Sequence, residues 1–212
     1  MEARKIRKLA LATVTSLCAI AAAAPGAQAG LLVPTVTDCP VEIPEKPFLR
    51  WHDPATYTLA PGGTLEGGGA GWTLSGASVV SGNETFYVHS GGDSASLSLP
   101  PGSSAITAPM CVGLEHPTLR FFARSSSRSL TGALLSSLRV DVVFESLGGV
   151  AAAVPIGVVT PTSSWQPTLP MLVVANALPL VPGRHTAVAF RFTPQGSASW
   201  RIDDVYVDPK RR

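Results

Sequence analysis

The sequence lacks the short motifs that mark the common catalytic chemistries. It has no G-x-S-x-G elbow for a nucleophilic serine. Its four histidines are scattered, without the i, i+4 spacing that would place two of them on one side of a helix as metal ligands. Carboxylates are present, but no spacing places two of them opposite each other, as glycoside hydrolysis requires. We therefore expect a protein that is not an enzyme.

A basic patch is also missing. The chain has 16 Lys and Arg against 14 Asp and Glu, and four of the basic residues lie in the first eight positions. Beyond residue 29 there are 12 basic and 13 acidic residues. This balance argues against nucleic acid as a partner, because nucleic-acid-binding domains concentrate Lys and Arg on one face.

No apolar run is long enough for a membrane span. The longest, residues 9–24, has 16 residues, whereas a spanning helix needs about 20. The run follows a basic segment and precedes Ala27-Gln-Ala29, which fits the small-x-small cleavage rule. We expect residues 1–29 to be a secretory signal peptide, and the protein to be secreted or associated with the cell envelope, without a membrane span after cleavage. A retained N-terminal anchor is the alternative.

Cysteine is scarce, with three residues in the chain. Cys18 lies in the predicted signal peptide, which leaves Cys39 and Cys111. An even number of cysteines in an exported chain favours one disulfide, and this one would pin the N-terminal arm to the domain. It would close a loop of about 70 residues, worth about 4 kcal/mol in the chain-entropy model. Two buried free thiols are the alternative.

Proline divides the rest of the chain into two parts. Residues 30–47 contain four prolines, and we expect an arm without regular elements there. Residues 48–212 suit a single domain with a sizeable core.

Within this domain, short apolar or alternating segments recur between turn signals, and helical periodicity is almost absent. The strands that we expect are 57–65, 72–75, 78–80, 86–90, 94–99, 109–112, 118–124, 138–145, 150–159, 184–194 and 199–207. Residues 170–180 could form a short helix or a hydrophobic loop. Many short strands and little helix predict an all-β fold, an antiparallel β-sandwich that residues 199–207 close.

Three strands alternate regularly enough to assign their core faces. The apolar positions are Leu119, Phe121, Ala123, Leu138, Val140, Val142, Phe144, Val188, Phe190 and Phe192.

The opposite faces of the strands are polar and rich in arginine. Aromatic rings stack on sugars, and guanidinium groups bind carboxylates or hydroxyls. We therefore select as candidate ligand-binding residues, lining one concave sheet, Tyr87, Arg120, Phe122, Arg124, Arg139 and Arg191. An ordinary solvated sheet face is the alternative.

Three short sequence motifs resemble those of the carbohydrate-binding-module jelly rolls, which are galactose-binding-like sandwiches. They are Gly62-Gly-Thr-Leu-Glu66-Gly with Trp72, then Ser164-Trp165-Gln166, and finally Ile202-Asp-Asp-Val205. The resemblance spans about residues 57–208 and implies a jelly-roll β-sandwich that binds carbohydrate. The sequences of residues 48–54 and 200–209 also resemble those of a group of secreted proteins from high-GC Gram-positive bacteria. This resemblance implies export and the same fold.

The jelly-roll resemblance also implies a structural calcium site. In that family a glutamate of the first strand meets an aspartate of the last strand, and the matching residues are Glu66 and Asp203, with Asp204 as a possible substitute. Ca²⁺ takes six to eight oxygen ligands, which carboxylates and backbone carbonyls can supply. The alternative is that these carboxylates face solvent or pair with arginine.

These observations together predict a secreted, non-catalytic binding module for a glycan or a cell-envelope component. The alternative is an extracellular structural or adhesive protein that binds other proteins or itself. The apolar segment 169–181 favours this second hypothesis.

Overall fold

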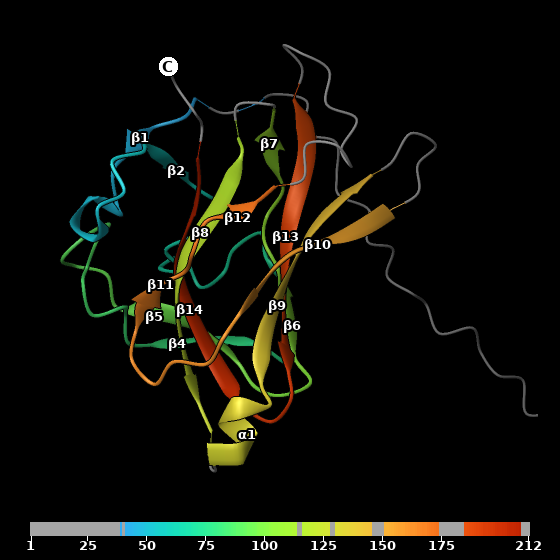
Figure 1. The fold of residues 1–212 in the computed structure, drawn as a ribbon. Coiled ribbons are helices and arrows are strands. Elements are labelled where there is room, and N and C mark those ends of the chain that lie inside the picture. Colours follow the sequence, from blue (N-terminus) through green and yellow to red (C-terminus); the bar gives the residue numbers. More distant parts are fainter. Residues whose placement is uncertain are drawn as a thin grey trace, which may run out of the picture.

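The computed structural model describes residues 39, 41–113, 116–127, 130–145, 151–173 and 185–208. These residues form two antiparallel sheets that pack face to face as a jelly-roll β-sandwich, so the predicted fold class is confirmed (Figure 1). The predicted signal peptide and most of the arm lie outside the described residues. Within these ranges, no helix has the length and hydrophobicity to cross a membrane.

The first sheet, sheet A, is organised around β14. This strand (Ser199–Val207) pairs with β2 (Tyr57–Leu59) and β5 (Ala95–Leu99) along one edge and with β8 (Thr118–Ser126) along the other. The short strands that extend the sheet are β1 (Pro44–Glu45), β4 (Ser78–Ser81), β11 (Gln166–Pro167) and β12 (Met171–Leu172).

The second sheet, sheet B, is organised around β13 (Thr186–Gln195). Its partners are β9 (Ser137–Glu145), β6 (Ser104–Ile106) and β7 (Met110–Val112). The strands β10 (Ala151–Val159) and β3 (Thr73–Ser75) pair with β9 and β6. A 3-10 turn, η1 (Leu49–Trp51), and a short helix, α1 (Leu130–Leu134), complete the described elements.

The main core lies between the two sheets. All ten positions assigned to the core from the alternation of β8, β9 and β13 are buried in one hydrophobic cluster, so the face assignment is confirmed. Alternation in a strand places every second side chain on the same face, and a sandwich buries that face in both of its sheets.

A second apolar cluster covers part of the outer face of sheet A. Phe48, just before η1, stacks on Phe122 of β8 with ring centroids 5.5 Å apart. Tyr57, Trp165 and Tyr206 are buried in the same cluster. The segment around η1 therefore lies over sheet A as a lid of aromatic side chains.

The expected strand at residues 86–90 is wrong, because this segment is a loop. The carboxylate of the buried Glu84 accepts the backbone N–H groups of Phe86 and Val88, which a strand would donate to a neighbouring strand. Between them, Tyr87 adopts a left-handed conformation with φ +50°. One side chain thus replaces the pairing that the alternating sequence had suggested.

The predicted disulfide between Cys39 and Cys111 is confirmed, and it joins the arm to β7. The arm contains one regular element that we did not expect, since Pro44–Glu45 forms β1. Proline is tolerated there because an edge strand needs few of its N–H groups for pairing. In the helix candidate 170–180, Met171–Leu172 forms β12, while residues 174–180 lie outside the described ranges.

Candidate functional site

The paired acids of the last strand lie at a β-bulge. The register of β14 against β8 shifts between Asp203 and Tyr206, and Asp204 has a φ of +47°. A bulge inserts one extra residue into a strand and re-aims its side chains. Here it places two adjacent carboxyl groups in the interior, since both aspartates are 0% exposed.

Asp203 holds the loop between β4 and β5 at residue Glu84. Its Oδ2 accepts the Glu84 N–H at 2.8 Å, and its Oδ1 accepts the Asp204 N–H at 2.9 Å. Glu84 in turn holds the N–H groups of Phe86 and Val88. The two carboxyl groups therefore connect residues 84–88 to β14.

The side chain of Asp204 differs, because both of its carboxyl oxygens are buried without a hydrogen bond to any residue that the structure describes. Burial raises its pKa to about 8, and so do the charges of four neighbouring carboxylates, which are Glu84, Asp93, Glu45 and Glu66. Burial and the Asp204 charge likewise raise the pKa of Asp203 to about 9. A buried carboxyl group without a partner needs either a proton or a cation.

The third predicted calcium ligand, Glu66, lies within electrostatic reach of Asp204 but is exposed. Its Oε1 accepts the N–H groups of Ser94 and Ala95, each at 2.7 Å. Asp93, beside them, has a buried Oδ2 without a hydrogen-bond partner. In the described part of the chain, no three His, Cys, Asp or Glu side chains are grouped to hold a metal ion. Among the described residues, the acids with buried carboxyl oxygens that lack a hydrogen-bond partner are Asp204 and Asp93.

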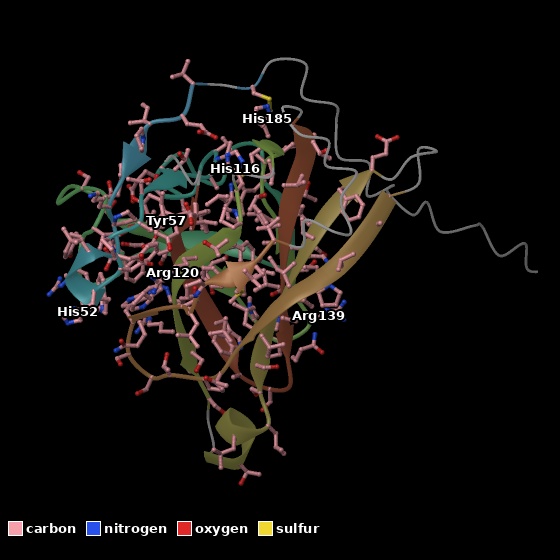
Figure 2. The ribbon with its side chains drawn as sticks, turned by 45° about the horizontal axis from the view of Figure 1, so that its top comes forward. His52, Tyr57, His116, Arg120, Arg139 and His185 are labelled. Carbon is pink, nitrogen blue, oxygen red and sulfur yellow. A yellow bond between two sulfur atoms is a disulfide. The ribbon has the colours of Figure 1, made fainter. Side chains whose placement is uncertain are left out.

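The six candidate ligand-binding residues do not line one sheet. Arg120, Phe122 and Arg124 belong to β8 of sheet A, whereas Arg139 and Arg191 belong to β9 and β13 of sheet B. Figure 2 shows Arg120 and Arg139 on opposite sides of the molecule. Regular alternation identifies the outward face of a strand, but it does not say to which sheet the strand belongs. The prediction of one shared concave face is wrong for this reason.

Two of these residues serve the fold. Phe122 is 0% exposed within the second apolar cluster. Arg120 donates from Nε to the Thr168 carbonyl at 2.8 Å, forms an ion pair with Asp53, and lies 4.1 Å from the Phe48 ring centroid. Its guanidinium group thus fastens the η1 region to sheet A.

On sheet B, two arginines share one buried acid. Asp141, which is 1% exposed, accepts Arg139 Nε at 2.7 Å on one oxygen. Its other oxygen accepts two nitrogens of Arg191, at 3.1 and 2.9 Å. One carboxylate therefore lies within hydrogen-bond distance of both guanidinium groups.

On sheet A, the corresponding arginines have no acid between them. Arg124 of β8 and Arg201 of β14 lie directly opposite each other. Both guanidinium groups lie over the Trp165 ring, at 5.4 and 6.0 Å from its centroid. Within the described residues neither arginine forms an ion pair, and the buried Nε of each has no acceptor. Arg124 was among the residues predicted from the sequence and Arg201 was not, although both occupy polar positions of alternating strands.

Aromatic rings reach the surface beside this outer face. Trp51 of η1 and Phe86 are half-buried and meet edge to face with centroids 4.8 Å apart. Arg50 lies over both rings, at 5.2 and 5.0 Å. Tyr87, next to Phe86, is 51% exposed. This aromatic surface is formed by two segments that are distant in sequence.

Two of the four histidines are brought together, which their spacing did not suggest. The rings of His116 and His185 lie 6.0 Å apart at the end of the sandwich that carries the disulfide (Figure 2). His116 Nδ1 accepts the Gly113 N–H at 2.9 Å, and its other ring nitrogen contacts the Glu42 carboxylate. These contacts connect the arm to the turn after β7.

Comparison with known proteins gives no family assignment. The sequence matches no family model and no curated protein. Among solved structures, tailspike protein 4 of bacteriophage CBA120 is 17% identical with a TM-score of 0.45, covering 70% of this chain and 21% of that one.

Two further structures come from xylanase 10B of Clostridium thermocellum. Its N-terminal CBM22-1–GH10 modules, complexed with xylohexaose, are 10% identical, with a TM-score of 0.44 and coverage of 66% of this chain and 26% of that one. Its C-terminal family 22 carbohydrate-binding module is 17% identical, with a TM-score of 0.38 and coverage of 68% and 90%. The chain thus spans about a quarter or less of the tailspike and of the two-module xylanase structure. The sandwich assignment rests on the strand pairing described above.

Proposed function

We propose that the protein is a secreted, non-catalytic module that binds glycan at the cell envelope through the outer face of sheet A. The observation that carries this proposal is the conformation of Tyr87. A bulky side chain at positive φ is strained, and such residues persist where the surrounding structure imposes them. Here the Glu84 carboxylate holds the N–H groups on either side of Tyr87, whose side chain is left half-exposed. Its neighbour in the chain, Phe86, contacts Trp51.

The chemistry of this surface suits a sugar. Aromatic faces stack on the apolar side of a sugar ring, and guanidinium groups donate to its oxygens. Trp51, Phe86 and Tyr87 supply the rings, and Arg50 supplies a guanidinium group that lies over two of them. The nearby carboxyl groups of Glu84 and Asp203 accept backbone N–H groups, which is a structural role rather than that of acids facing a substrate.

A calcium ion is the second part of this proposal. Asp204 and Asp93 carry buried carboxyl oxygens without hydrogen-bond partners among the described residues, and the charge of Glu66 acts on Asp204. Bound calcium would supply the positive charge that these carboxylates lack. Because Asp93 precedes β5 and Asp204 belongs to β14, an ion bound by both would fix the loop before β5 against sheet A.

Glycan binding is tested by titrating the purified protein with soluble polysaccharides and cell-wall fractions in a calorimeter. The Tyr87→Gly variant removes the ring while keeping a residue that accepts φ +50°. We expect it to lose at least tenfold in affinity with an unchanged unfolding midpoint. Leu134→Ala, which alters an exposed apolar residue of α1, is the matched control. Full binding by Tyr87→Gly, or no glycan bound by the wild type, would contradict the proposal.

Calcium is tested by thermal unfolding with added calcium and with EDTA. An ion that binds only the folded protein raises the midpoint by mass action. The increase should disappear in Asp204→Asn and Asp93→Asn. An unchanged midpoint in the wild-type protein would remove calcium from the proposal and leave glycan binding to its own test.

One observation favours the alternative of a protein partner. A groove of about 460 Å³ lies between β10 and the β11–β12 segment. Around it, Val158, Leu169 and Leu172 are 62%, 83% and 67% exposed. Exposed apolar side chains gathered at one place mark protein-binding surfaces. Sedimentation equilibrium of the wild type and of Leu169→Ser/Leu172→Ser tests self-association, and a monomer at high concentration would exclude a second copy of the chain as that partner.

A further inference from the structure

The Arg124–Arg201 pair is unusual because like charges directly opposite each other destabilise a sheet. Burial lowers the pKa of Arg201, and the neighbouring Arg124 charge lowers it further. Arg201 donates to the carbonyls of Ser81 and Gly82 at 2.6 and 2.7 Å, and to the Ser96 hydroxyl. None of these acceptors is charged, so the hydrogen bonds position the guanidinium group without neutralising it.

The nearest acid on this face is Asp203, two residues from Arg201 along β14. Its charge would raise the pKa of Arg201, but its oxygens are bonded to the Glu84 and Asp204 N–H groups. Among the described residues, Asp203 therefore forms no ion pair with Arg201 or Arg124.

Arg124 has still fewer partners. Its guanidinium group makes no hydrogen bond to the described residues and lies over the Trp165 ring. Trp165 is buried, so it provides a fixed flat surface on which the guanidinium group rests. Stacking orients the planar fork of an arginine and leaves its N–H edge open to bind a carboxylate, sulfate or phosphate.

We propose that Arg124 and Arg201 form an anion-binding site on the outer face of sheet A. This inference rests on the proposed function, and it specifies that the bound glycan is acidic. Phe122 links the two surfaces, because it precedes Arg124 by two positions on the same face of β8 and contacts Phe86 with centroids 5.8 Å apart. A glycan chain that lies over Tyr87 and Trp51 can thus place an acidic group over the arginine pair.

The experiment compares each acidic glycan with its neutral counterpart in the same assay. Oligogalacturonate is paired with its methyl ester, and dextran sulfate with dextran, so that a carboxylate and a sulfate are tested separately. We expect the acidic member of at least one pair to bind about tenfold more tightly at low salt. The preference should weaken as salt is added, because the interaction is between charges.

Arg124→Gln should abolish this preference while the variant stays folded, since Arg124 makes no hydrogen bond within the described residues. The matched control is Arg139→Gln, which removes one positive charge from the other sheet and should leave the preference unchanged. Equal binding of acidic and neutral members by the wild type would overturn the inference. So would an equal loss in both variants, which would indicate a general charge effect.

A second measurement separates this inference from glycan binding. Titrating the protein with sodium sulfate or galacturonate should shift the NMR signal of the Arg124 Nε–H, and Arg201→Gln should reduce that shift. A shift without binding of any polysaccharide would support the anion site and contradict the glycan proposal. Binding of neutral glycans without a shift would contradict the anion site and support the glycan proposal.

Discussion

The outer faces of the two sheets each carry a pair of arginines, but the guanidinium groups have different partners on the two faces. On sheet B, Arg139 and Arg191 converge on Asp141, which is buried between them. On sheet A, Arg124 and Arg201 share an indole ring instead of an acid. The buried acids of sheet A, Asp203 and Asp204, lie at the bulge, where no arginine of the described ranges forms an ion pair with them.

The difference matches the proposed function, in which the outer face of sheet A binds the ligand. On sheet B each arginine contacts the Asp141 carboxylate, so neither guanidinium group lacks an acidic partner. On sheet A the arginines and the buried acids are not paired, which lowers stability, and ionisable groups in such surroundings are typical of functional sites. The pairing of the charges, rather than their number, distinguishes the two faces.

The largest effect that we predict concerns the acids of sheet A. In EDTA the free energy of unfolding should fall as the pH rises from about 4 to about 9. An unfolded aspartate titrates near 3.8, whereas burial raises the folded values to about 8 for Asp204 and about 9 for Asp203. Between these limits the folded protein holds more protons than the unfolded one, so the slope is negative, on the order of 1 kcal/mol per pH unit.

Urea unfolding at pH 5, 7 and 9 measures this slope. Asp204→Asn should flatten it, and saturating calcium should reduce it. Asp53 and Glu66, whose pKa values are lowered, act in the opposite direction but only below about pH 4.5. Stability that is level or rising between pH 5 and 9 in EDTA would contradict the prediction.

A smaller effect on stability is expected from changing Asp141, the buried acid of sheet B. Asp141→Asn should lower the free energy of unfolding by about 2–3 kcal/mol, because it leaves two guanidinium groups facing a neutral side chain. This loss is smaller than that expected from breaking a fully buried ion pair, since Arg139 and Arg191 are partly exposed. Urea unfolding at pH 7 gives the loss, and a loss below 0.5 kcal/mol would show that solvent already screens these arginines.

The smallest effect should come from placing an acid beside the arginines of sheet A, as Asp141 lies beside those of sheet B. Ser126 is exposed and lies two positions from Arg124, as Asp141 does from Arg139. Ser126→Asp should stabilise the protein by about 0.5 kcal/mol at low salt, as expected of an exposed ion pair. It should also remove the preference for acidic glycans. Stabilisation with the preference intact would place the anion elsewhere.

The fold was predictable because it follows from alternation. The core positions of β8, β9 and β13 follow from every second residue being apolar, and the closing strand was identified at residues 199–207. The loop at 86–90 was not predictable in this way, because its conformation depends on the Glu84 carboxylate, which competes for backbone donors. Alternation alone carries no information about such a contact.

The site was predicted only in part, for a similar reason. The calcium site stays a prediction. The acids of Ile202-Asp-Asp-Val205 are buried, but the bulge that distinguishes Asp203 from Asp204 depends on the strands beside them. Asp93 was missed because Gly91-Gly-Asp93 is an ordinary turn sequence. Arg201 and Trp165 become a site only when β14, β8 and the segment before β11 meet.

The central position of β14 also determines when sheet A can form during synthesis of the chain. The chain is synthesised from its N-terminus, so β2, β5 and β8 exist long before the strand that joins them. Until about residue 207 has been made, sheet A remains in separate pieces, and the bulge with its buried acids cannot form. Late completion of sheet A would suit passage of an unfolded chain through a translocation channel, if the export that the N-terminal residues predict takes place.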